Sequence, residues 1–111
     1  MEQSHRSMDA VSTGVAGLDA VLEHRLRLGA CVLLSRVDAL AFPRLKAVLG
    51  ATDGNLGAQM RKLEEEGYVR VRKEFQGRKP ITWYSLTSQG RSGLRAHLAA
   101  MEKLINGSEV G

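Results

Sequence analysis

The fold is decided by residues 49–68, which read LGATDGNLGAQMRKLEEEGY. Gly50 readily adopts the positive φ that a tight turn requires. Thr52 follows at the position of a helix N-cap, where its hydroxyl can accept a hydrogen bond from a first-turn N–H group. Apolar residues then recur with helical spacing at Leu56, Met60 and Leu63. We therefore predict a tight turn and a helix that ends at Gly67.

The side of this helix that faces away from the apolar residues is bare in two turns and basic in the third. On a helical wheel it carries Gly54, Gly57, Ala58, Arg61, Lys62 and Glu65. Each glycine destabilises a helix by about 1 kcal/mol relative to alanine. A helix that only covered a core would not need these two glycines, whereas a helix that lies close against another large surface would.

The composition describes a small globular protein with a basic surface. The chain has 111 residues, 43% of them hydrophobic and 25% charged, with a net charge of +4. These values predict one domain and favour a polyanionic partner. The single cysteine, Cys31, excludes an internal disulfide and fits a reducing compartment. Without a long apolar run or a signal-peptide pattern, we expect a cytoplasmic protein that has no membrane partner.

Upstream of the turn, the sequence predicts an arm and two helices. Residues 1–16 show no sustained period and are expected to form a flexible arm. From about residue 18 to 36 the pattern is helical, and a second apolar line on this helix is expected to face another subunit. That line comprises Leu28, Cys31 and Leu34. Residues 42–49 predict a short helix with proline in its first turn, which completes a helix-turn-helix.

Downstream of Gly67 the apolar period changes from 3.6 to 2. Residues 68–75 and 81–86 predict two strands, joined by a basic turn over residues 76–80. Thr87 or Ser88 is expected to cap a last helix, which carries an apolar seam of coiled-coil spacing at Leu94, Leu98, Met101 and Ile105. Residues 107–111 are expected to be a disordered tail. The predicted fold is mainly α with a small β-hairpin, over residues 17–106.

In this order, the elements resemble the winged helix-turn-helix of MarR/ArsR-type bacterial regulators, and more narrowly the short stand-alone winged-helix family. The matching segments are LKAVLG (45–50), TDGNL (52–56), KLEEEGYV (62–69), FQGRKP (75–80) and TWYSLTSQGR (82–91). The resemblance covers roughly residues 18–105. It implies a homodimeric, DNA-binding transcriptional regulator without a cofactor. Its recognition helix would enter the major groove, its hairpin, or wing, would lie on the backbone or minor groove, and its outer helices would dimerise.

One departure from the family concerns the recognition helix. Relatives often carry Ser, Arg or His where this chain has Gly57 and Ala58. Fewer side chains are therefore available to read bases directly, and phosphate contacts and DNA shape are expected to contribute more of the affinity.

The expected DNA-binding residues lie on the recognition helix and in the hairpin turn. They are Thr52, Asp53, Gly54, Asn55, Gly57, Ala58, Gln59, Arg61, Lys62, Arg78 and Lys79. Thr52 and the first-turn N–H groups suit a phosphate, whereas Gln59 could touch a base edge or pack against the core. Arg70, Arg72 and Lys73 are expected to form a solvated strand face. The expected dimerisation residues are Leu28, Cys31, Leu94, Leu98, Met101 and Ile105.

The function that follows is a homodimeric regulator that represses a promoter by binding an inverted repeat, with half-sites about one helical turn apart. The alternative is a winged-helix module for protein–protein contact without DNA binding. His5, His24 and His97 lack the spacing of a metal site, Cys31 is expected to be an inert buried thiol, and no nucleophile–base pair predicts an enzyme. Any small-molecule effector is expected to bind between the dimerising and DNA-binding parts.

Overall fold

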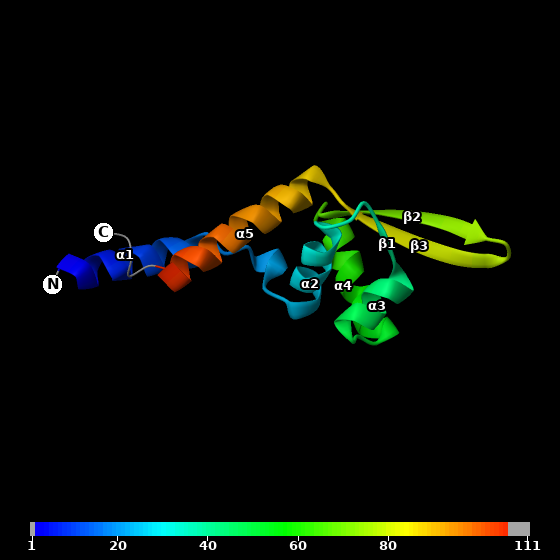
Figure 1. The fold of residues 1–111 in the computed structure, drawn as a ribbon, viewed down its shortest axis with the longest axis horizontal. Coiled ribbons are helices and arrows are strands. Elements are labelled where there is room, and N and C mark those ends of the chain that lie inside the picture. Colours follow the sequence, from blue (N-terminus) through cyan, green and yellow to red (C-terminus); the bar gives the residue numbers. More distant parts are fainter. Residues whose placement is uncertain (1, 107–111) are drawn as a thin grey trace.

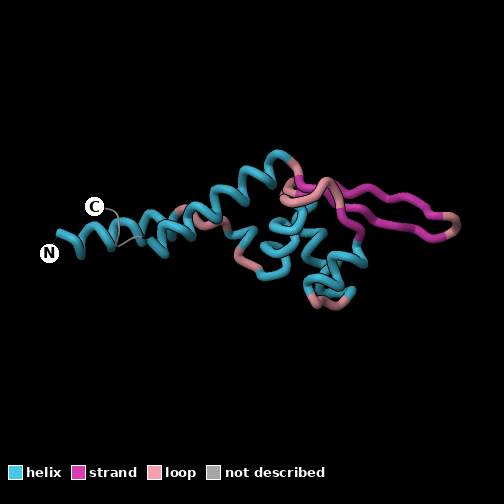
Figure 2. The backbone as a smooth tube through the Cα atoms, in the orientation of Figure 1, coloured by secondary structure: helices cyan, strands magenta, loops and turns pink. Residues whose placement is uncertain are grey.

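The computed structural model describes the backbone of residues 2–106 and the side chains of residues 8–106. The molecule is elongated, with extents of 67 × 25 × 21 Å. Helices α1 (Glu2–Ala16) and α5 (Ser88–Asn106) contact each other and form a stalk at one end (Figure 1). A β-hairpin forms the other end, and the remaining helices lie between the two (Figure 2).

Helix α1 corrects the expectation of an arm without regular structure. Residues 2–16 form a helix that packs against α5. The two helices approach closely at Gly14, where an added Cβ would lie 2.9 Å from Leu104 Cδ2. The helix is stabilised by this tertiary contact, which explains why its own sequence shows no sustained period. The tail expected at 107–111 lies outside the described residues.

The long helix expected near residues 18–36 is divided in two. A 3-10 helix, η1 (Ala20–Leu22), precedes α2 (Arg25–Leu34), and His24 stands between them. The Nδ1 atom of His24 accepts a hydrogen bond from the Leu26 N–H at 3.1 Å and so caps α2.

Helix α2 is apolar on several sides because other elements of the same chain surround it. It contacts α3 (Phe42–Leu49), α4 (Asp53–Glu65), α5 and β3 (Lys79–Leu86). Cys31 is consequently fully buried in the core of a single chain, and Leu94 of α5 is only 5% exposed. This burial corrects the expectation that Cys31 and Leu94 lie on a dimer surface.

The helix-turn-helix has the predicted form. Helix α3 has the predicted bounds, and Gly50 follows it with φ of 60°. Thr52 caps α4, because its Oγ1 accepts a hydrogen bond from the Asn55 N–H at 3.2 Å. Gly67 follows the end of α4 with φ of 80°, so the chain can turn there into the sheet.

The sheet has three antiparallel strands in the order β1-β3-β2. The hairpin joins β2 (Val69–Gln76) to β3, and the pairing of Gln76 with Lys79 leaves a loop of only Gly77 and Arg78. Gly77 has φ of 64°, as the first loop position of a type II′ turn requires. Strand β1 (Leu40–Ala41) pairs with the base of β3. The sequence did not predict β1, since two residues are too short to show a period.

A chain of hydrogen bonds joins the stalk to the rest of the molecule. The Asp19 N–H donates to Nδ1 of the buried His97 in α5 at 3.0 Å. The Asp19 carboxylate accepts from the Tyr68 hydroxyl and from the Val21 N–H. Burial, reinforced by the bond to Asp19, raises the pKa of Tyr68 to about 12. We call Asp19, His97 and Tyr68 the joint.

The architecture is thus a mainly helical winged helix whose N- and C-terminal helices contact each other. Its core lies between α2, α3, α4 and the base of the sheet. The largest fully buried side chains are Leu22, Leu34, Leu45, Leu56, Met60 and Leu63. Within residues 2–106, no helix has both the length and the hydropathy needed to cross a membrane.

Candidate nucleic-acid interface

The outward face of α4 is exposed and nearly free of side chains at its N-terminal end. Gly54 and Ala58 are exposed there, and Gly57 is half-buried. A Cβ added at Gly54 or Gly57 would meet no atom of the described residues within 4 Å. Both positions have ordinary helical φ values. No described contact within the chain therefore accounts for these glycines.

Two charged residues of α4, Asp53 and Lys62, form ion pairs with residues outside this helix. Lys46 Nζ lies 2.9 Å from Asp53 Oδ1, and Lys62 Nζ lies 3.1 Å from Glu66 Oε1. Such exposed ion pairs contribute at most about 1 kcal/mol each, so a phosphate can replace the carboxylate at small cost. Arg61 is exposed and takes part in none of the ion pairs found among the described residues.

Gln59 is turned toward α2 rather than outward. Arg27 Nη1 donates a hydrogen bond to Gln59 Oε1 at 2.6 Å, and Arg27 is itself held by the Val21 carbonyl oxygen. The structure therefore shows Gln59 hydrogen-bonded within the chain, and contact of its side chain with a base edge stays a prediction.

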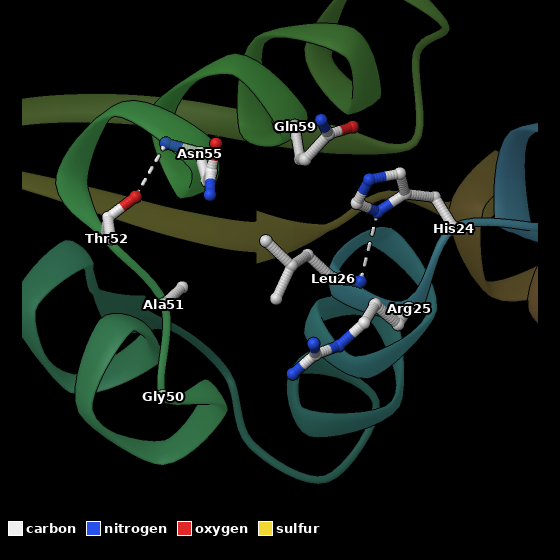
Figure 3. A pocket seen from close by; sticks show the side chains of 8 residues that line it. All are labelled: His24, Arg25, Leu26, Gly50, Ala51, Thr52, Asn55 and Gln59. Atoms are coloured by element: carbon white, nitrogen blue, oxygen red, sulfur yellow. Dashed lines mark hydrogen bonds between the residues drawn. The ribbon is translucent and has the colours of Figure 1, made fainter.

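A cavity of about 310 Å³ opens between the N-terminal ends of α2 and α4 (Figure 3). Arg25 of α2 and Asn55 of α4 line facing sides of it, and Thr52 lies at its edge. The N-terminal ends of helices carry a partial positive charge, which together with Arg25 suits an anion. Arg25 was not predicted from the sequence, because the expected continuous helix placed it in mid-helix. The signal that could have located it is His24, an uncommon N-cap residue.

The hairpin tip carries the two remaining predicted DNA-binding residues. Arg78 lies in the two-residue loop, Lys79 follows it, and both are exposed. Phe75 is 74% exposed and pairs across the hairpin with Pro80. The tip therefore combines two positive charges with an exposed aromatic ring, and it lies far from the stalk (Figure 1).

The basic residues of β2 do not share one face, contrary to the expectation of a single solvated face. Arg70 and Arg72 line a cavity on the side of the sheet away from α4. Lys73 lies on the opposite side, because residues alternate along a strand. There it lines a second cavity, of about 220 Å³, between α4 and the sheet.

The surface of the stalk is unusually apolar. Its exposed large hydrophobic residues are Met8, Val11, Val15, Leu98 and Ile105. At its base, an apolar groove of about 340 Å³ is lined by Leu28 of α2 and by His97, Met101 and Leu104 of α5. Four of the six residues predicted for dimerisation thus reach this surface, and Cys31 and Leu94 do not.

The remaining candidate for chemistry is Cys31. Burial, followed by the carboxylate of Asp19, raises the pKa of the Cys31 thiol to about 12. The thiol therefore stays protonated at neutral pH and is a poor nucleophile. Among the described residues, no cluster of three or more His, Cys, Asp or Glu could hold a metal ion. The side chain of His5 lies outside those residues.

Comparison with known proteins matches residues 26–105 to the family model of a winged helix DNA-binding domain. The chain belongs to this family. This match confirms the winged helix-turn-helix that the sequence resembled, and it identifies the chain as a DNA-binding protein rather than an enzyme.

One protein is similar to this chain in sequence, and two solved structures are similar to it in fold. An uncharacterised protein of Methanocaldococcus jannaschii is 30% identical over 84 residues, which cover 76% of this chain and 91% of that protein. The structure of a transcriptional regulator homologue from Pyrococcus horikoshii matches with a TM-score of 0.75 and 26% identity, over 99% of this chain and 100% of that one. A MarR-family regulator from Silicibacter pomeroyi shares the fold, with a TM-score of 0.62, 19% identity, and coverage of 97% and 73%.

Proposed function

We propose that the protein is a homodimeric transcriptional repressor that binds an inverted repeat in duplex DNA. In this proposal α4 lies in the major groove and the hairpin tip contacts the backbone or minor groove. One observation carries the proposal: the outward face of α4 holds two glycines, Gly54 and Gly57, that no described contact within the chain requires. A close approach by another molecule would explain why this helix has them.

Phosphate contacts are proposed to supply most of the affinity. The exposed face of α4 offers Arg61 and Lys62, and the tip offers Arg78 and Lys79. Few side chains project from the first two turns of α4, since Gly54, Gly57 and Ala58 occupy them. Binding should therefore depend steeply on salt, and sequence preference should reflect DNA shape as well as base contacts.

The stalk supports the proposal of a dimer. Side chains such as Ile105, 77% exposed, and Met8, 68% exposed, present large apolar surfaces to solvent in a single chain. A second copy of the chain would cover these residues and the groove at the base of α5. Two chains related by a two-fold axis would place two copies of α4 on two half-sites of a palindrome.

The test is to measure the oligomeric state together with binding to random and promoter-upstream duplexes at several salt concentrations. We expect a dimer whose log affinity falls linearly with log salt and which prefers one palindromic duplex. Repression is then tested with a reporter that carries this duplex at its promoter. A monomer, or reporter expression that rises on binding, would contradict that part of the proposal.

A pair of matched charge variants locates the surface. The double variant Arg78→Gln, Lys79→Gln should weaken binding and lower the salt slope by about 2, one unit for each phosphate contact. The control variant Arg36→Gln, Arg95→Gln removes the same charge from exposed positions elsewhere and should change the slope less. If wild-type protein shows neither salt dependence nor duplex preference, the alternative of a protein–protein module stands instead.

A further inference from the structure

The cavity between α4 and the sheet has a composition that suits an anion. Its walls come from α4, which contributes Gly57, Arg61 and Glu64, and from the sheet, which contributes Lys73. The remaining lining residues are Met60, Val71, Thr82 and Tyr84. Positive side chains thus stand on both walls, at a distance from the hairpin tip and from the N-terminus of α4.

Within the described part of the chain, neither positive side chain of this cavity is neutralised by an ion pair. The ion pairs of the described residues join Lys46 to Asp53, Lys62 to Glu66 and Arg72 to Glu74. Arg61 and Lys73 therefore have no carboxylate within 4 Å among those residues, although Glu64 lines the same cavity. On the far side of the sheet, by contrast, Arg72 is paired with its neighbour Glu74.

Gly57 gives the cavity its depth on the helix side. A side chain at this position would project into open space, since a Cβ there meets no described atom within 4 Å. The glycine destabilises α4 by about 1 kcal/mol relative to alanine, and no contact among the described residues compensates for this. A group that enters the cavity from outside would provide that compensation.

Duplex geometry indicates which group this is. If α4 lies in one groove and the hairpin tip contacts the neighbouring groove, a sugar–phosphate strand separates them. That strand must cross the space between α4 and the hairpin, where this cavity lies. We propose that the cavity seats a phosphate of the crossing strand, with Arg61 and Lys73 on its two sides and Gly57 allowing close approach. This inference rests on the proposed DNA-binding function and adds Lys73 to its contact residues.

The first test compares two charges on opposite faces of β2. Lys73→Gln should weaken duplex binding about threefold or more at physiological salt and lower the salt slope by about 1. Arg70→Gln removes the same charge three residues away, on the face that points away from α4, and should have a smaller effect. Equal effects of the two variants would contradict the proposed phosphate site, because binding would then depend on the net charge of the protein and not on the position of Lys73.

The second test uses the acidic residue of the cavity. Glu64→Gln removes a negative charge beside the proposed phosphate and should strengthen binding, by about twofold or more at low salt. The neighbouring exposed Glu65 does not line the cavity, so Glu65→Gln is the matched control and should strengthen binding less. A weakening on Glu64→Gln would contradict the inference.

The third test measures both protein stability and duplex binding for a substitution at Gly57. Gly57→Ala should raise the melting temperature, because alanine favours the helix and its Cβ meets no described neighbour. The same variant should weaken duplex binding at least severalfold, since the methyl group occupies the seat. A variant that is more stable and binds equally well would exclude a close approach at Gly57.

Duplexes with single uncharged backbone linkages test the phosphate site separately from the proposed DNA-binding function. In the preferred duplex, single phosphates are replaced in turn by uncharged methylphosphonates, and binding is measured for wild-type protein and Lys73→Gln. One linkage between the two contacted grooves should weaken wild-type binding and affect Lys73→Gln much less. If wild-type protein binds the duplex but no linkage couples to Lys73, the seat fails and the proposed function stands. If wild-type protein binds no duplex, both fail.

Discussion

Helices α4 and α5 each carry two glycines three residues apart near their N-terminal ends, yet the reasons differ. In α5, a Cβ at Gly90 would overlap the Tyr68 carbonyl oxygen, and one at Gly93 would lie 2.9 Å from the Tyr68 hydroxyl. In α4, a Cβ at Gly54 or Gly57 meets no described atom within 4 Å. Glycine in α5 is therefore explained by packing within the chain, and glycine in α4 points to a contact outside it.

The largest expected effect belongs to Gly90→Ala. The added methyl group would overlap the backbone of Tyr68, which cannot move without disturbing the bonds from Thr87 to its carbonyl oxygen. We expect a loss of about 3 kcal/mol or more in the free energy of unfolding, measured by urea denaturation. A loss of less than about 1 kcal/mol in the free energy of unfolding would be no larger than that of an ordinary surface substitution. The glycines of α5 would then not differ from those of α4 in being required by packing.

The contact between Gly93 and Tyr68 can be isolated with a double-mutant cycle. Gly93→Ala should destabilise wild-type protein by about 1–2 kcal/mol through overpacking against the phenol. In the Tyr68→Phe background the hydroxyl is absent, so the same substitution should be less destabilising. Additive effects in the cycle would show that the hydroxyl is not what excludes a side chain at Gly93.

Tyr68 also predicts how stability depends on alkaline pH. Burial and the bond to Asp19 raise the pKa of Tyr68 from its ordinary value near 10 to about 12. The stability that the protonated phenol contributes is therefore complete below about pH 10 and is lost as the pH rises through about 12. Tyr68→Phe should show a shallower decline over this range, followed as the urea midpoint against pH. An unchanged decline would assign the loss to other groups, such as the Cys31 thiol.

The smallest expected effect is of opposite sign. Gly54→Ala should stabilise the protein by about 0.5–1 kcal/mol, since the site is helical, exposed and free of described neighbours. If α4 lies against DNA at this point, the same variant should weaken duplex binding. If Gly54→Ala destabilised the protein, packing within the chain would require a glycine at this position. The glycines of α4 and α5 would then have the same explanation.

Local rules predicted the helix-turn-helix and the hairpin well. The bounds of the helix-turn-helix follow from the N-cap at Thr52 and from the positive φ values of Gly50 and Gly67. These residue types can be recognised in the sequence without knowledge of the fold. The hairpin was predicted for the same reason, although Gly77 closes a tighter loop than expected.

The errors arose where tertiary contact decides the structure. The helix at residues 2–16 depends on α5, and the two-residue strand β1 depends on β3. One of the apolar sides of α2 was expected to face another subunit. A single sequence does not show which elements of the same chain surround a helix. Lys73 was grouped with Arg70 and Arg72 although strand alternation separates them. Only the position of α4 shows that the face of Lys73 borders that helix.

The joint formed by Asp19, His97 and Tyr68 has a mechanical consequence. The molecule is 67 Å long, and the joint connects the stalk at one end to the part that ends in the hairpin tip. If the stalk rotated slightly about the joint relative to the rest of the molecule, the hairpin tip would be displaced. This displacement would increase with the distance between the joint and the tip. In the proposed dimer, the separation of the two hairpin tips would depend on the orientation of the stalk, which the hydrogen bonds of the joint and the packing of α5 against α2 and β3 hold in place far from the tips.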